Sequence, residues 1–152
     1  MKQLTGACII GQSGGPTAVI NASAQGVIQT ALKADCITHV LGAAHGIKGV
    51  LEDKLYDMGQ EDSVELDLLK FTPSSALGSC RYKLPENMDA SVYPLLFEKF
   101  KAMNIGAVFY IGGNDSMDTA DKLSRYAAMA KEDIVFIGVP KTIDNCLLYT
   151  SD

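Results

Sequence analysis

The sequence has no cluster of more than two or three basic residues and no apolar run long enough to cross a membrane. Its 152 residues include 13 Lys and Arg against 18 Asp and Glu, which gives a formal net charge of -5 at pH 7. Nucleic acids and membrane surfaces are usually bound through concentrated positive charge, so we expect neither as a partner. Any anionic ligand must therefore be held by local groups within a site.

Paired cysteines are also missing. The four cysteines, at positions 8, 36, 80 and 146, form no C-x-x-C pair and no spacing typical of a metal site. This favours reduced thiols, and residues 1–8 are too short and too polar for a signal peptide. We therefore expect a cytoplasmic protein of about one domain, since a hydrophobic fraction of 47% is enough for a core.

Short apolar runs alternate with segments of helical period, and Gly46 and Gly49 indicate a turn-rich loop between two of them. The expected strands are residues 7–10, 40–44, 107–111 and 134–139. The expected helices are residues 64–71, residues 116–129, a segment with Ile20, Ala24, Val27, Ile28 and Ala31 on one face, and a segment with Val92, Leu95, Leu96, Phe100 and Met103 on one face. This alternation predicts an α/β protein with a mostly parallel sheet.

Two loops that follow predicted strands carry chemically useful groups. The Gly-Gly-Asn-Asp-Ser loop at residues 112–116 precedes a helix, so its amides should point out of the carboxyl edge of the sheet, where polyphosphates bind. The loop after the strand at 134–139 supplies Lys141, Thr142 and Asp144. A lysine, a hydroxyl and a carboxylate are the minimum set for moving a phosphoryl group onto an alcohol.

A third loop, Ser13-Gly14-Gly15, follows the first strand. It has neither the lysine of a P-loop nor the glycine spacing of a dinucleotide fingerprint, so a different phosphate cradle is needed. A single Gly-Gly would be explained by turn chemistry, but three such loops in one sheet favour a site.

Five motifs, in order, resemble the phosphofructokinase family. They are Ser13-Gly14-Gly15 followed by Asn21, the His-Gly-Ile-Lys-Gly loop at 45–49, the Leu-Gly-Ser-Cys-Arg loop at 77–81, and the loops at 112–116 and 140–145. The resemblance implies the amino-terminal domain of such an enzyme, a Rossmann-like three-layer sandwich, with residues 1–145 as its phosphate-donor-binding part. Residues 146–152 depart from the family and read like a translated library adapter, so we expect a spurious tail, with the remainder of the enzyme absent.

Two departures resemble the diphosphate-dependent branch of the family. Asp115 stands where the ATP-using pattern has a glycine, and Lys141 stands where it has the glycine after proline. A carboxylate at 115 would oppose the inner phosphate of a nucleotide, while Lys141 would add charge for a shorter donor. The resemblance thus implies phosphoryl transfer in glycolysis from pyrophosphate to the 1-hydroxyl of fructose 6-phosphate.

The same resemblance assigns the catalytic roles. Asp144 would be the general base, Thr142 would hydrogen-bond the transferring phosphoryl group, and Lys141 and Arg81 would neutralise its charge. The implied donor-binding residues are Gly14, Gly15, Gly113, Asn114, Asp115 and Ser116.

Magnesium is the expected companion of pyrophosphate. The family pattern places carboxylates where this sequence has Asn114 and Cys146. Asn114 can offer a carbonyl oxygen to a hard cation, whereas a thiol is a poor substitute, so Asn114 is the one candidate ligand.

Other functions remain open at the level of the sequence. An ATP-dependent phosphofructokinase is the nearest, and Asp115 with Lys141 counts against it. An NAD or lipid kinase that shares a Gly-Gly-Asp-Gly loop is more remote. A non-catalytic, regulatory homologue that binds phosphorylated ligands would fit the missing metal carboxylates. We expect a homo-oligomer at full length, and an inactive fragment with exposed strand edges at 152 residues.

Overall fold

The computed structural model describes residues 5–13, 18–60, 77–78 and 82–140. Within these ranges its strands are β1 (Gly6–Gln12), β2 (Ile37–Ala43), β3 (Leu55–Asp57), β4 (Ile105–Gly112) and β5 (Val135–Pro140). Its helices are α1 (Ala18–Lys33), α2 (Ile47–Leu51), α4 (Val92–Ala102), α5 (Asn114–Ala130) and the 3₁₀ turn η1 (Met58–Gln60). The predicted helix at 64–71 and the tail at 146–152 lie outside the described residues.

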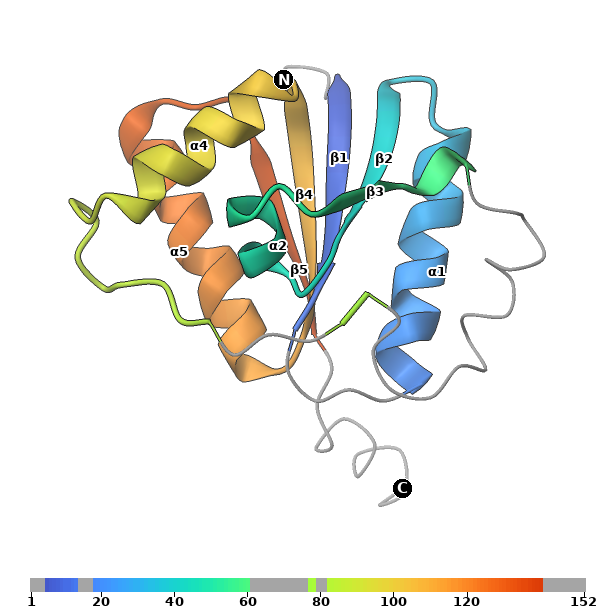
Figure 1. The fold of residues 1–152 in the computed structure, drawn as a ribbon, viewed down its shortest axis with the longest axis horizontal. Helices are drawn as coiled ribbons and strands as arrows, with labels where there is room; N and C mark the ends of the chain where they lie inside the picture. The colour runs from blue at the N-terminus through green and yellow to red at the C-terminus, as the bar shows by residue number, and fades with distance from the viewer. Residues whose placement is uncertain (1–4, 14–17, 61–76, 79–81, 141–152) are drawn as a thin grey trace.

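The strands form one sheet in the order β3-β2-β1-β4-β5. β1 pairs in parallel with β2 and β4, and β4 pairs in parallel with β5, whereas β3 runs antiparallel to β2. The mostly parallel sheet expected from the sequence is therefore confirmed. Because β1, β4 and β5 run parallel, they end at the same edge of the sheet (Figure 1).

Helices cover both faces of this sheet. Figure 1 shows α1 on one side and α2, α4 and α5 on the other. Alternate residues of β1 explain this arrangement, because Ala7 and Ile9 pack into the core under α2, α4 and α5, while Cys8 and Ile10 pack into the core under α1. The three-layer sandwich is confirmed.

The buried face of α4 matches the predicted one except at Leu95, since Leu96 and Phe100 are buried and Val92 and Met103 pack against the core. Tyr93, Leu96, Phe97 and Phe100 are buried, while Leu95 is 46% exposed. The buried set follows the i, i+3, i+4, i+7 pattern of one helix face, and Leu95 lies off it. The prediction that Leu95 shares the core face was wrong, because a helix that buries Tyr93, Leu96, Phe97 and Phe100 turns Leu95 toward solvent.

The turn-rich loop expected at Gly46 and Gly49 contains a short helix instead, α2. A Cβ on Gly49 would lie 2.0 Å from the carbonyl oxygen of Ala44, so the glycine lets this helix pack directly on the end of β2. The chain then returns as β3, the antiparallel edge strand, which the sequence patterns did not predict.

Two further predictions concern thiols and membranes. Among the described residues, Cys8 and Cys36 are free thiols, and burial raises the pKa of the Cys8 thiol to about 11. The other two cysteines lie outside the described residues. No helix in the described part of the chain has the length and apolar character of a membrane span.

Candidate active site

Three loops leave the carboxyl edge of the sheet from neighbouring strands. Gln12 at the end of β1 pairs with Ile111 of β4, and Gly112 at the end of β4 pairs with Pro140 of β5. The predicted loops therefore begin side by side. Of the predicted site residues, Gly14, Gly15, Arg81, Lys141, Thr142 and Asp144 lie outside the described residues.

The Gly-Gly-Asn-Asp-Ser segment passes directly from strand to helix. Gly113 is the N-cap of α5 in an extended conformation, and its carbonyl oxygen accepts hydrogen bonds from the amides of Ser116 and Met117, both at 3.1 Å. Asn114 and Asp115 occupy the first turn and are exposed. The amino end of a helix attracts negative charge, so this turn offers amides and side chains together at the edge of the sheet.

Gly112 is required by a close approach of two segments. A Cβ at this position would lie 1.9 Å from the carbonyl oxygen of Ser13 and 2.2 Å from the hydroxyl of Ser116. Because Gly112 has no side chain, the chain after β1 can lie against the start of α5. The two glycine-bearing loops are thereby brought into contact.

A hydrogen bond joins the same two segments. The hydroxyl of Ser116 is fully buried and donates to the carbonyl oxygen of Ser13 at 3.0 Å. The structure therefore places this hydroxyl in a contact between two loops. The expectation that Ser116 also contacts a phosphate donor stays a prediction.

Asp115 faces solvent on the rim of this edge. Its side chain is 73% exposed, and its Oδ1 lies 3.9 Å from Nζ of Lys83, whose side chain is 74% exposed. An exposed pair of this kind contributes little stability. Both charges therefore remain accessible to a ligand, and Lys83 is a candidate that the sequence reasoning missed.

Gln12 is a second residue that the sequence reasoning missed. Its fully buried amide donates to Oδ1 of Asn21 in α1 at 3.0 Å and accepts from the backbone amide of Leu77 at 2.8 Å. Leu77 in turn accepts from the amide of His45 at 2.8 Å. One side chain thus links β1, α1 and the segment that precedes Arg81. A polar residue ending an apolar run just before a glycine loop was the available signal.

The second-strand loop is held against β4. The amide of Ile47 donates to the hydroxyl of Tyr110 at 3.3 Å, and Gly46, with φ of 62°, leaves room for that hydroxyl. A Cβ on Gly46 would lie 2.5 Å from the Tyr110 oxygen. Both the backbone conformation and the close contact favour glycine there.

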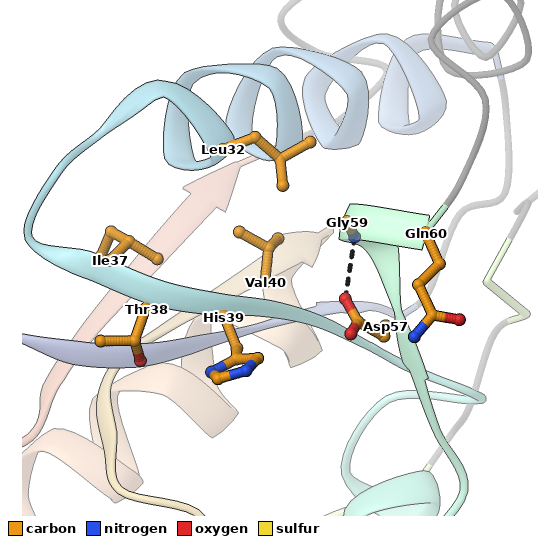
Figure 2. Close-up of a pocket in the computed structure, with 8 residues that line it drawn as sticks. All are labelled: Leu32, Ile37, Thr38, His39, Val40, Asp57, Gly59 and Gln60. Carbon is orange, nitrogen blue, oxygen red and sulfur yellow. Dashed lines mark hydrogen bonds between the residues drawn. The ribbon is translucent and has the colours of Figure 1, made fainter.

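A hollow of about 250 Å³ lies elsewhere, beside β2 and β3 near the end of α1 (Figure 2). It is lined by Leu32, Ile37, Thr38, His39, Val40, Asp57, Gly59 and Gln60. The residues from β2 come from the first half of that strand, away from its carboxyl end. This hollow is therefore separate from the predicted loops.

The candidate metal ligands lie in the first turn of α5. The described residues contain no group of three or more His, Cys, Asp or Glu able to hold a metal ion. The first turn of α5 supplies one carboxylate, from Asp115, and one amide oxygen, from Asn114. Mg²⁺ commonly takes one or two protein oxygens and completes its shell with phosphate oxygens and water. These two residues fit a magnesium ion bound together with a phosphate ligand.

These features are typical of one class, the α/β proteins whose phosphate-binding loops lie where parallel strands end. The match can be made more specific. The phosphofructokinase family model matches residues 7–151, nearly the whole chain, and the chain therefore belongs to the phosphofructokinase family.

Its relatives point to one branch of that family. The chain is 43% identical over 143 residues to a pyrophosphate--fructose 6-phosphate 1-phosphotransferase of Rhodospirillum rubrum, covering 94% of this chain and 34% of the relative. It is 46% identical over 146 residues to the enzyme of the same name from Xanthomonas campestris pv. campestris, covering 95% of this chain and 34% of the relative.

A solved structure shares the fold. The crystal structure of a pyrophosphate-dependent phosphofructokinase from Nitrosospira multiformis matches with a TM-score of 0.85 and 46% identity, covering 91% of this chain and 34% of that one. The chain thus spans about a third of the length of the relatives it matches.

Proposed function

We propose that this chain is the donor-binding part of an enzyme that transfers a phosphoryl group from pyrophosphate to the 1-hydroxyl of fructose 6-phosphate. The observation that carries the proposal is the first turn of α5, where Asp115 exposes a carboxylate beside Gly113 at the carboxyl edge of the sheet. The relatives at 43% and 46% identity are named for this reaction. The proposal concerns the whole enzyme, of which relatives have about three times this length.

The choice of donor follows from electrostatics. At about 4 Å, a like-charge contact between Asp115 and a nucleotide's inner phosphate costs about 1 kcal/mol in water and about 4 kcal/mol at an effective dielectric of 20. Since the Asp115 side chain is 73% exposed, the cost lies toward the lower value. Pyrophosphate has no further substituent that must pass this carboxylate. The electrostatic cost of the like-charge contact therefore applies to the nucleotide.

The catalytic roles come from the family resemblance. Asp144 takes the proton from the attacking sugar hydroxyl, Thr142 hydrogen-bonds the transferring group, and Lys141 and Arg81 neutralise its oxygens. The position of Gly113, Asn114 and Asp115 at the start of α5 supports their proposed role in donor binding, while Gly14 and Gly15 lie outside the described residues.

Magnesium belongs to the same proposal. Bound with pyrophosphate, it would supply positive charge that neutralises the phosphate oxygens. Asn114 and Asp115 would hold it or its waters from the first turn of α5. We also propose a cytoplasmic, glycolytic enzyme that forms a homo-oligomer at full length.

The test uses the full-length protein that contains this sequence. Phosphorylation of fructose 6-phosphate is measured with pyrophosphate and with ATP, each with and without magnesium. Asp144→Ala should lower the pyrophosphate rate by about a hundredfold or more. Asp121→Ala, an exposed residue of α5 that pairs with Arg125 at 3.0 Å, is the control and should change little.

Each outcome separates the candidate functions. Activity with ATP alone would overturn the role given to Asp115 and favour an ATP-dependent enzyme. No activity with either donor, together with binding of sugar phosphates, would favour the regulatory homologue.

A further inference from the structure

A buried lysine occupies the middle of α5. The Lys122 side chain is only 4% exposed, and its ammonium group lies 2.7 Å from Oδ2 of Asp118 and 2.9 Å from Oε1 of Glu86. It also donates to the carbonyl oxygen of Leu84 at 2.9 Å. A lysine has three donors and no acceptor, so all three are satisfied here. The two carboxylates raise the pKa of Lys122, which keeps it charged.

These contacts fasten a separate segment of the chain to α5. Leu84 is 3% exposed, and the hydroxyl of Tyr93 in α4 donates to the carbonyl oxygen of Pro85. Within residues 82–86, Leu84 and Glu86 therefore contact α5, and Pro85 contacts α4. Within this segment, Lys83 lies 3.9 Å from Asp115 in the first turn of α5, and the residue before the segment is Arg81.

The geometry points to Lys122 as a positioning residue for the phosphoryl donor, an inference that rests on the proposed function. Lys122 binds Leu84 and Glu86, so that the neighbouring Lys83 is held beside Asp115. Without Lys122, Lys83 would belong to a segment that has lost its contacts with the middle of α5. An error of position at a site for charged phosphates weakens binding and orientation together.

The fold itself depends less on this lysine. Asp118 and Glu86 have side chains that are 50% and 82% exposed, so water can solvate both carboxylates when the lysine is removed. Removing one partner of a buried ion pair is costly chiefly when it leaves a buried charge without compensation, and neither remaining carboxylate is buried here. The contribution of Lys122 is therefore to geometry, and it should be seen in donor kinetics.

The experiment compares Lys122→Met with Lys99→Met in the full-length protein. Lys99, in α4, makes the matched remote ion pair, 2.8 Å from Asp53, with a side chain that is 21% exposed. Lys122→Met should lower kcat/KM for pyrophosphate by about tenfold to a hundredfold, through a raised KM for pyrophosphate, with KM for fructose 6-phosphate unchanged. Lys99→Met should leave both KM values unchanged.

A second variant tests the inference in case Lys122→Met fails to fold. Glu86→Gln alters one exposed partner of the lysine and should raise the KM for pyrophosphate in the same direction by a smaller factor. Hydrogen exchange of the amides of Tyr82, Lys83, Leu84 and Glu86 should be faster in both variants. Equal changes in the KM of both substrates, or no change beyond a lower Tm, would overturn the inference.

The two proposals fail in different ways. If the unsubstituted protein neither uses nor binds pyrophosphate, the proposed function falls and this inference falls with it. If the unsubstituted protein uses pyrophosphate but the variants at 122 and 86 bind it equally well, the inference alone is overturned.

Discussion

At the carboxyl edge of the sheet, the segments lie so close that a methyl group has no room, whereas the hollow beside β2 and β3 is open to solvent. A Cβ on Gly112 would lie 1.9 Å from a backbone oxygen, and the neighbouring Ser116 hydroxyl is fully buried in a hydrogen bond. In the hollow, Leu32 is 42% exposed, and Thr38 and His39 are also exposed (Figure 2).

The difference supports the carboxyl edge as the region of the proposed site. Preorganised amides and fixed loops bind phosphates because their order is already established before the ligand arrives. In the hollow, the hydrogen bond from the amide of Gly59 to Oδ1 of Asp57, at 2.9 Å, joins two residues of one short turn. At the carboxyl edge, the hydrogen bond from Ser116 to Ser13 joins segments that are distant in the sequence.

The largest effect is expected from filling the closest contact. Gly112→Ala should lower the free energy of unfolding by about 3 kcal/mol, since the new methyl group must displace backbone as well as the Ser116 side chain. In the full-length enzyme, kcat/KM for pyrophosphate should fall by about a hundredfold. Gly26→Ala is the control.

Gly26 lies in the exposed middle of α1, with no atom within 4 Å of its Cβ position. Its replacement by alanine should raise stability by about 0.5 to 1 kcal/mol. Chemical denaturation of both variants provides the measurement. Equal effects of the two substitutions would contradict the close packing of the carboxyl edge.

The next effect concerns the donor. Asp115→Asn should raise kcat/KM for ATP by about tenfold, since the like-charge penalty against a nucleotide is removed from a solvent-exposed position. Asp121→Asn, which removes an exposed charge from the same helix, is the matched control. Steady-state kinetics with both donors provides the measurement, and an unchanged ATP rate would show that Asp115 does not exclude the nucleotide.

A smaller effect sharpens the contrast between buried and accessible groups. Because burial raises the Cys8 pKa to about 11 and Cys8 is fully buried, its thiol should resist alkylation at pH 8 while the half-buried Cys36 reacts first. The pKa of Cys8 is about 11 in the folded protein and about 8.5 in the unfolded chain, so the neutral thiol stabilises the folded state. This stabilisation is fully present below about pH 8.5 and is lost as the pH rises through about 11. Mass spectrometry after timed labelling would reveal the order, and equally fast labelling of Cys8 would show that the core opens locally.

The smallest effect is expected in the hollow. His39→Ala removes an exposed lining residue and should change neither KM value, because the hollow lies away from the carboxyl ends of β1, β4 and β5. Kinetics with pyrophosphate and fructose 6-phosphate would check this. A selective rise in one KM would make the hollow part of the functional site.

The sequence by itself determined β1, β2, β4 and β5, the helices α1, α4 and α5, and the glycine-bearing segment between β4 and α5. These features depend on local periodicity and turn chemistry, which act over a few residues. The same local reasoning was wrong for Leu95, and it missed α2 as a helix and β3 as a strand. Their conformations depend on which neighbours they pack against.

Only the tertiary structure decided how the edge is held together. Ser116 bonds Ser13 across 103 positions of the chain, Gln12 bonds Leu77 across 65, and Lys122 bonds Leu84 across 38. A buried polar side chain must find partners, but the sequence does not say which backbone groups the fold will bring near. Those partners are set by the packing of the parallel strands and of α1, α4 and α5, which places distant segments in contact.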